Sequence, residues 1–244
     1  MNMTPEHIKQ LGTIMGIWAH PDDETFMMAG LMAAAAQNGQ NVVCVTATKG
    51  EAGSQDPLRW PLTELAGIRS LELVEALQIL GVKHHHWMSY PDGGCTKVPD
   101  DQAVAQLEPL IARHQPDTII TFPPDGLTGH EDHKAVSRWA TKVAAKSAKP
   151  VAIYYGVVTQ EMYNSHFKEM DSKMNIFFNI AQPRLYQANT CDLLFTLPPD
   201  IAQKKHRALE IMPSQYATMF QLFPERFLQD AFATEAFVSA SKPG

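Results

Sequence analysis

The amino-acid sequence predicts an α/β fold: a Rossmann-like, mostly parallel sheet with helices on both faces and a C-terminal α/β cap. Short apolar runs alternate with helical patterns of 12 to 20 residues up to about residue 160, an order typical of βαβ units. The run VVCVTAT at 42–48 is apolar or β-branched throughout, as in a strand buried on both faces. Two of the helical patterns end at a glycine, Gly39 and Gly81, where helices commonly stop.

The elements follow in a regular order. A buried strand is predicted within 12–19 (GTIMGIWA), followed by a helix at 26–37 that stops at Asn38-Gly39. Strand 42–48 precedes a helix at 63–81, in which Leu73, Ala76, Leu77 and Leu80 recur at i, i+3, i+4 and i+7. Similar patterns predict strand 84–90, helix 101–115, strand 117–122, helix 130–148 and strand 151–158.

The pattern weakens after residue 160. We expect β structure at 175–181 (NIFFNIA) and 193–197 (LLFTL), and helices at 198–212 and 216–232. No repeat or low-complexity linker interrupts the chain, so we interpret residues 1–244 as a single domain. Its core covers about 12–160 and its cap about 161–244.

The composition excludes several classes of function. With 20 Lys and Arg against 26 Asp and Glu, the net charge is −6, and we expect no nucleic-acid partner. Three cysteines cannot form a disulfide framework and suit a reducing compartment. The N-terminus lacks the apolar stretch of a secretory signal, and the longest apolar run, 26–36, is too short to span a membrane. We therefore expect a cytoplasmic protein; the sequence leaves open whether it forms homo-oligomers.

The first cluster of reactive side chains, AHPDDE at 19–24, follows the first predicted strand. In sheets of this kind, working residues lie on loops after the carboxyl ends of strands. An imidazole at His20 and a carboxylate at Asp23 can point at one ion, and zinc accepts this mixture of ligands. Adjacent aspartates cannot share one direction on a turn, so Asp22 is left in the position of a general base.

The second cluster, GHEDH at 129–133, follows the fourth predicted strand. His130 and His133 lie on one face of a helix that begins there, because they are three residues apart. A catalytic zinc site has three protein ligands and one open position. His20, Asp23 and His133 are the predicted ligands, which leaves His130 to meet the substrate.

Together, AHPDDE and GHEDH resemble the LmbE-like, or PIG-L-type, zinc-dependent N-deacetylases. The resemblance covers residues 12 to about 140, and it includes Thr48-x-Gly50-Glu51, Arg69-x-x-Glu72, Pro91-Asp92-Gly93 and Ser214-Gln215. It implies the same zinc ligands, with Asp22 as the general base. It also implies that His130 stabilises the tetrahedral oxyanion and that Asp132 tunes His130. One departure is Met212, where family members often carry histidine on the far wall of the site.

The resulting prediction is a zinc-dependent hydrolase that removes the acetyl group from an N-acetylated amino sugar or its conjugate, with Fe²⁺ as the alternative ion. The general base beside zinc is expected to keep a low pKa, and Asp132 is expected to hold His130 charged near neutral pH. Arg69, Asp92 and Glu51 are the candidates for contacts with this small-molecule substrate. For Arg69 the alternative is a helix-surface pair with Glu72.

Two alternative hypotheses for the function stay open: hydrolysis of another small amide, and a non-catalytic metal-binding protein. The tract His84-His85-His86 is interpreted as a strand surface rather than a metal site, because successive side chains of a strand point to opposite faces. Cys95 lies near the predicted site and is interpreted as a buried thiol rather than a nucleophile.

Overall fold

The computed structural model describes residues 2–241, in which one mixed sheet has the strand order β1-β7-β8-β6-β5-β2-β3-β4. Neighbouring strands are parallel except where β8 pairs with β6 and β7, to which it runs antiparallel. The strands are β1 (Asn2–Met3), β2 (Ile14–Trp18), β3 (Val42–Thr48), β4 (His84–Tyr90), β5 (Thr118–Thr121), β6 (Ala152–Val157), β7 (Leu193–Thr196) and β8 (Thr234–Ser239).

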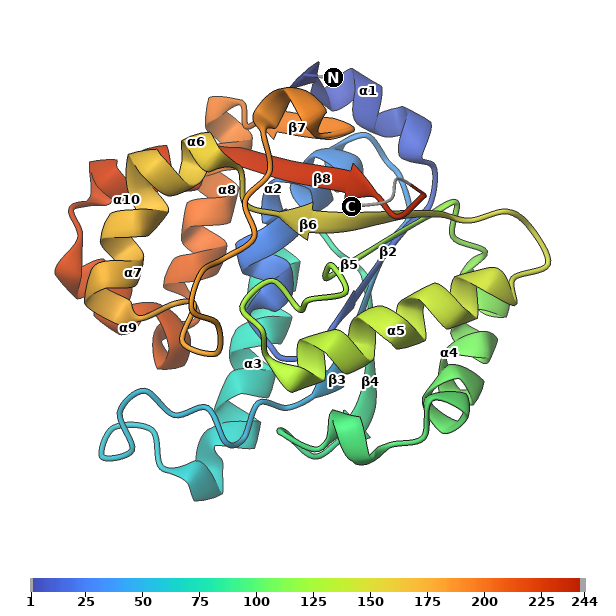
Figure 1. Cartoon of the computed structure of the whole chain (residues 1–244), viewed down its shortest axis with the longest axis horizontal. Helices are drawn as coiled ribbons and strands as arrows, with labels where there is room; N and C mark the ends of the chain where they lie inside the picture. The colour runs from blue at the N-terminus through green and yellow to red at the C-terminus, as the bar shows by residue number, and fades with distance from the viewer. Residues whose placement is uncertain (1, 242–244) are drawn as a thin grey trace.

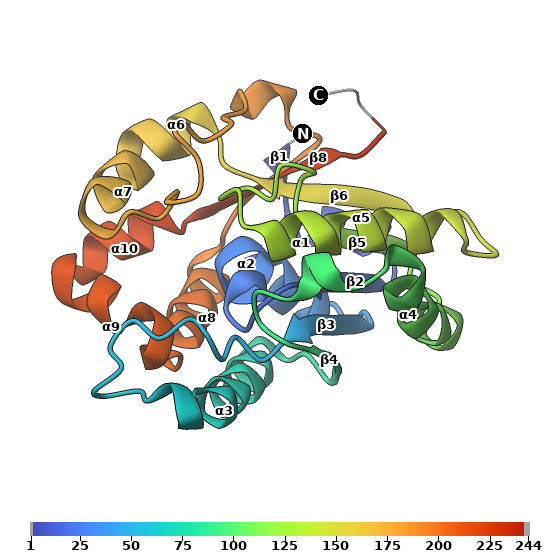
Figure 2. The ribbon, with the colours of Figure 1, turned by 60° about the horizontal axis from the view of Figure 1, so that its bottom comes forward.

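Helices cover both faces of the sheet. Helices α2, α3 and α8 pack together on one face with α1 beside α2, and α4 and α5 pack together on the other (Figure 2). The helices are α1 (Pro5–Ile8), α2 (Asp23–Gln37), α3 (Leu62–Leu80), α4 (Asp100–His114), α5 (Glu131–Ala145), α6 (Gln160–Met162), α7 (Lys168–Met174), α8 (Pro199–Glu210), α9 (Pro213–Leu222) and α10 (Glu225–Ala231). Figure 1 shows α6, α7, α9 and α10 gathered at one end of the molecule, beside α8.

The centre of the sheet explains where a site can form. Every residue of β2, β3 and β5 is buried, in agreement with the apolar and β-branched runs of the sequence. The chain runs from β2 to β3 and β4 on one side, and later adds β5 and β6 on the other side of β2. The carboxyl ends of β2 and β5 therefore border the crevice where the strand order reverses, the usual ligand position in such sheets.

The predicted α/β class is confirmed, and two strands, β3 and β4, have the predicted bounds. The strand expected at 175–181 is wrong, because this segment forms turns and bends. The helix expected at 216–232 is in fact two helices, α9 and α10, separated at Phe223-Pro224, where proline disfavours helical geometry in the residue before it. Strand β8 was not predicted.

Helix α2 contains a break that the sequence did not reveal. Met28 has non-helical dihedral angles, φ −143° and ψ 18°. Beyond the break, the Glu235 carboxylate of β8 accepts hydrogen bonds from the backbone N–H groups of Gly30 (2.7 Å) and Leu31 (2.8 Å). Before it, Lys205 Nζ of α8 donates to the carbonyl oxygen of Phe26 (2.9 Å) and to Glu235 (2.8 Å). A buried ion pair thus satisfies the backbone groups that the break leaves free.

Among residues 2–241, no helix combines the length and apolar character needed to cross a membrane.

Candidate active site

The candidate site lies at the carboxyl ends of β2 and β5. His20 follows β2 by two residues, and Asp23 is the first residue of α2. His130 caps the N-terminus of α5, and His133 lies in the first turn of that helix. The fold therefore brings together the two clusters that the sequence singled out, although they are more than 100 residues apart.

Two imidazole nitrogens face each other at the centre of the site. His133 Nε2 lies 3.2 Å from His20 Nδ1. The Asp23 carboxylate lies beside both, with Oδ1 3.3 Å from His133 Nε2 and Oδ2 3.5 Å from His20 Nδ1. These distances place three donor groups around one point.

The remaining nitrogen of each ring faces an acceptor. His133 Nδ1 lies 2.9 Å from the carbonyl oxygen of Gly126, and the His133 ring is stacked on Phe122 at 3.9 Å between centroids. His20 Nε2 lies 3.0 Å from Asp92 Oδ1 and 3.4 Å from Asp132 Oδ2. Protons on these outer nitrogens leave the two inner nitrogens with free lone pairs, the tautomers that metal-binding histidines adopt.

The donor set fits a divalent metal ion. Two donors bound at about 2.0–2.1 Å to a tetrahedral zinc lie about 3.3 Å apart, close to the distances between the histidine and Asp23 atoms. Burial alone would lower the pKa of His20, but Asp132, Asp23 and Asp92 raise it well above 6.5. Three carboxylates around one imidazole thus favour a positive charge here. His130 lies beside this donor set, since ring nitrogens of His20, His130 and His133 lie within 4.8 Å of one another.

The main contacts of Asp132 are with other groups than His130. Its carboxylate accepts hydrogen bonds from the backbone N–H groups of Gly93 (2.8 Å) and Cys95 (3.0 Å), and it faces His20. The protein groups do not favour the expected charge on His130: burial and the nearby His20 lower the pKa of His130 and outweigh Asp132, which raises it. His130 Nδ1 accepts the backbone N–H of Asp132 (3.2 Å), so the proton of a neutral ring is on Nε2.

Asp22 has a strained backbone, with φ +122°, a region that residues with a Cβ rarely adopt. Two buried side chains hold this turn: Arg69 donates to the carbonyl oxygen of Pro21 (2.5 Å), and the Tyr216 hydroxyl donates to that of Asp22 (3.1 Å). Burial, with Asp23 adding to it and Arg69 opposing it, raises the pKa of Asp22 to about 7. The sequence analysis expected a low pKa for Asp22 because it placed a zinc ion beside the carboxylate. A nearby cation lowers the pKa of a carboxyl group, whereas burial raises it.

Arg69 anchors the loop that follows β3. It is 3% exposed, and it donates to the carbonyl oxygen of Gly50 (2.8 Å) as well as to Pro21. Gly50 has φ +66°, and a Cβ there would overlap the Arg69 guanidinium, so glycine is required. Glu72 is also buried and accepts from the backbone N–H (3.0 Å) and hydroxyl of Ser214. These contacts replace the expected surface pair between Arg69 and Glu72.

The other two predicted substrate contacts, Glu51 and Asp92, are linked by hydrogen bonds, and Asp92 contacts His20. Glu51 Oε1 accepts the backbone N–H of Asp92 (3.0 Å), and Asp92 Oδ2 accepts that of Ala52 (2.9 Å). Asp92 and Arg69 line the cavity described next, and Glu51 does not. The loops after β3 and β4 are therefore locked together beside the imidazole.

A cavity of about 460 Å³ opens onto these groups. The cluster side chains His20, Asp22, Asp23, His130 and His133 line one part of it. Arg69 and Asp92 also line it, together with residues of α2, the loop at 53–55, the segment 122–128, the segment 170–178 of the cap, and α9. A reactive centre and an enclosed volume for a small molecule thus coincide.

Comparison with known proteins identifies the family. A family model described as "PIG-L: GlcNAc-PI de-N-acetylase" matches residues 15–144, more than half of the 244-residue chain. The chain belongs to this family. The matched residues include both clusters of the PIG-L site and end within α5.

Individual relatives extend this result. A 1D-myo-inositol 2-acetamido-2-deoxy-alpha-D-glucopyranoside deacetylase of Corynebacterium glutamicum is 34% identical over 140 residues, 49% of this chain and 48% of the relative. The chain therefore spans about half the length of the curated relatives it matches. The solved N,N'-diacetylchitobiose deacetylase from Pyrococcus horikoshii has a TM-score of 0.64 at 21% identity, covering 95% of this chain and 85% of that one.

The same fold also occurs in an enzyme of another class. The 4-carboxy-2-hydroxymuconate hydratase from Pseudomonas putida KT2440 has a TM-score of 0.62 at 16% identity, covering 96% of this chain and 97% of that one. The shared architecture alone therefore does not specify the reaction.

Sequence reasoning missed Tyr216 and misplaced Met212. Tyr216 lies in α9, far from the PIG-L motifs in sequence, and an isolated tyrosine there carries no signal of its contact with Asp22. Met212 is fully buried in the core and is not among the cavity-lining residues.

The histidine tract at 84–86 lies on β4, where His85 contacts Thr46 (3.0 Å) and His86 contacts His114 of α4 (2.9 Å). Burial raises the pKa of the Cys95 thiol, which opposes thiolate chemistry.

Proposed function

We propose that this PIG-L family protein is a metal-dependent hydrolase that removes the acetyl group from an N-acetylated amino sugar or its conjugate. The observation that carries the proposal is the convergence of His20 Nδ1, His133 Nε2 and the Asp23 carboxylate on one point of the cavity wall. Asp22 lines the same cavity, and its carboxylate is not needed as a ligand.

The proposed metal ligands are His20, Asp23 and His133, and the proposed ion is zinc, with Fe²⁺ as the alternative. When bound, such an ion supplies Lewis-acid activation of water and of the amide carbonyl. Asp92 and Asp132 orient His20, and the carbonyl oxygen of Gly126 orients His133. Carboxylates and carbonyls in these positions fix the tautomer of the ligand and increase its basicity.

Asp22 is the proposed general base. It lines the cavity, and the contacts of Arg69 and Tyr216 to carbonyl oxygens of its turn hold its strained backbone in place. A carboxylate held in this way takes the proton of the attacking water without moving first. Arg69, 3.4 Å from Asp22 Oδ1, stabilises the ionised form.

His130 is the proposed oxyanion donor. Because its Nδ1 accepts a backbone N–H, its Nε2 proton is free to donate. A hydrogen bond from this proton to the developing oxyanion needs no charge on the ring, and one such donor is typically worth about 3–4 kcal/mol in the transition state. This role for a neutral ring replaces the charged His130 expected from the sequence.

Arg69 and Asp92 remain proposed contacts for substrate hydroxyls, since both line the cavity. Glu51 acts through the backbone of Asp92. The proposal further includes a small-molecule sugar substrate, no nucleic-acid partner and a cytoplasmic location, on the grounds of composition given above.

The test combines metal analysis with amide hydrolysis. Purified protein is loaded with Zn²⁺ or Fe²⁺, its metal content is measured, and released amine is detected with a panel of N-acetyl sugars. We expect amine release with one of these ions at one equivalent per chain. Full metal occupancy with no hydrolysis of any N-acetyl sugar would reject deacetylation. Hydrolysis of non-sugar amides alone would favour the alternative hypothesis, a hydrolase of another small amide.

A further inference from the structure

The residues that line the cavity form two chemically different groups. One is polar and includes the reactive side chains of His20 and Asp22. The other is apolar and comes from α2, the loop after β5, the cap and α9: Phe26, Met27, Leu127, Met170, Met174, Ile176, Phe178 and Met219. We refer to these eight residues as the apolar wall.

Further uncharged hydrogen-bonding side chains of the cavity suit a neutral ligand. Ser54, Gln55 and Gln215 also line the cavity, and they offer hydroxyl and amide groups. Such uncharged groups match the hydroxyls of a sugar.

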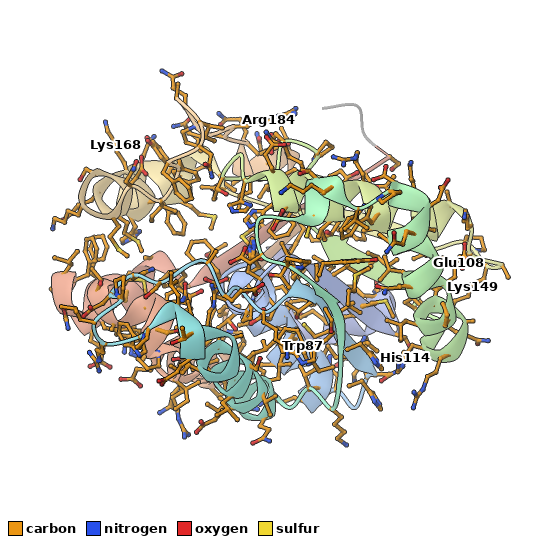
Figure 3. The ribbon with its side chains drawn as sticks, turned by 90° about the horizontal axis from the view of Figure 1, so that it is seen from below. Trp87, Glu108, His114, Lys149, Lys168 and Arg184 are labelled. Carbon is orange, nitrogen blue, oxygen red and sulfur yellow. The ribbon has the colours of Figure 1, made fainter. Side chains whose placement is uncertain are left out.

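Apart from the proposed metal ion, the cavity offers no uncompensated cation to a phosphate or carboxylate. Among the described residues that line it, Arg69 carries the only permanent positive charge, and the Asp22 carboxylate, 3.4 Å from its guanidinium, balances that charge. Lys168 and Arg184 are not lining residues, and Figure 3 shows both at the outer edge of the cap. An anionic group that lies on the apolar side chains, away from the metal ligands, would therefore meet no permanently charged side chain of opposite sign.

Two features of the apolar wall indicate that it contacts a ligand. Phe178 is 62% exposed although it borders the cavity, so an aromatic ring remains in water unless something covers it. Four of the eight side chains are methionines, whose flexible thioethers adapt to the shape of an apolar partner. A substrate made only of sugar and polyol would leave this surface without a complementary group.

We infer that the substrate carries an uncharged apolar arm, alkyl or aryl, that packs on the apolar wall while its amide lies beside the reactive side chains. This inference rests on the proposed function, because it concerns the substrate of the same site. The arm has two chemical sources: the aglycone of the amino sugar, or an N-acyl chain longer than acetyl. Both present the same methylene or ring surface to the wall.

Four substrates separate these cases when assayed with the metal-loaded protein. They are N-acetylglucosamine, its hexyl glycoside, N-hexanoylglucosamine, and the inositol glycoside named for the curated relatives. Burying one methylene changes an equilibrium constant about fourfold, so an arm with only two or three covered methylenes gives a gain of at least about tenfold. We expect kcat/KM to rise by that factor for one of the two hexyl compounds, and which one identifies the source.

A pair of variants ties the gain to the wall. Phe178→Ser should reduce the ratio of kcat/KM between the preferred hexyl compound and N-acetylglucosamine. Leu71→Ser is the matched control, since Leu71 is 74% exposed on α3 and does not line the cavity. It should leave the ratio unchanged.

The inference is overturned if N-acetylglucosamine or the inositol glycoside is hydrolysed as efficiently as both hexyl compounds. If no amide is hydrolysed, the proposed function fails. Binding measured by calorimetry then tests the inference independently of catalysis. Hexyl glucosaminide or N-hexanoylglucosamine should bind at least about tenfold more tightly than glucosamine, with the advantage reduced in Phe178→Ser. Equal binding of the three compounds would overturn it.

Discussion

Replacing Lys205 by methionine should destabilise the protein far more than replacing a partly exposed lysine with a similar ion-pair distance. Lys205 and Glu235 are 2% and 1% exposed, and their charged atoms lie 2.8 Å apart. At an effective dielectric constant of 20, the attraction over that distance is about 6 kcal/mol. The backbone N–H groups of Gly30 and Leu31 still stabilise Glu235 in the variant. We therefore expect a loss of about 3–5 kcal/mol, the usual range for a buried charge deprived of its partner.

The matched control is Lys134→Met. Lys134 pairs with Glu131 at 2.7 Å, but these side chains are 32% and 68% exposed. The expected loss is less than about 1 kcal/mol, because water screens an exposed pair. Urea unfolding of chelator-treated protein, followed by circular dichroism, measures both losses on the same scale.

A double-mutant cycle tests the cause. Glu235→Gln alone should also destabilise the protein, and the double variant Lys205→Met/Glu235→Gln should be more stable than the sum of the two losses predicts, by at least about 2 kcal/mol. Equal losses for Lys205→Met and Lys134→Met, or additive effects in the cycle, would show that the pair does not stabilise the break in α2.

Three further outcomes are expected. Asp22→Asn should lower kcat about one hundred to ten thousandfold while the metal content stays at the wild-type level; loss of metal together with activity would contradict its role as the base. Asp92→Asn should weaken metal binding about ten- to one hundredfold, measured by chelator competition, because Asp92 orients His20; unchanged affinity would remove it from that role. Burial, with a smaller effect of His86, lowers the pKa of His85 to about 4. A histidine in the unfolded chain takes up its proton near pH 6.5, so His85 should lower the free energy of unfolding by at most about 3 kcal/mol as pH falls from about 6.5 to about 4. In urea unfolding, the free energy of unfolding of His85→Gln should fall less steeply with decreasing pH, and identical pH slopes for the variant and wild type would exclude this contribution.

The sequence predicted best where a local pattern determines the structure. Strand β3 was predicted to the residue because seven consecutive apolar or β-branched residues suit a strand buried on both faces. The two clusters at 19–24 and 129–133 could be placed together because each follows a strand of one parallel sheet. Their contact did not require knowledge of any side-chain conformation.

Prediction was poorer where the decisive contact lies far away in the chain. Glutamate and lysine are residue types typical of protein surfaces, and only the packing of β8 and α8 against α2 shows that Glu235 and Lys205 are buried. The contact of Asp132 with His20 was not predicted, because sequence proximity favoured His130, whereas the strand-end loops bring His20 to the Asp132 carboxylate. The segment 175–181 has a strand-like composition, but its apolar residues Ile176 and Phe178 line the cavity instead of pairing with a strand.

The position of β8 has a consequence for the order in which the molecule can assemble. This strand, at residues 234–239, lies between β6 and β7, so the β1–β7 pair joins the rest of the sheet only through it. During synthesis β2 to β6 emerge long before β8, and they must wait for this partner with one strand edge open. Glu235 arrives on the same strand, so the break in α2 receives its cap at that late stage. Completion of the sheet and final positioning of the helix that begins at Asp23 are therefore one folding event.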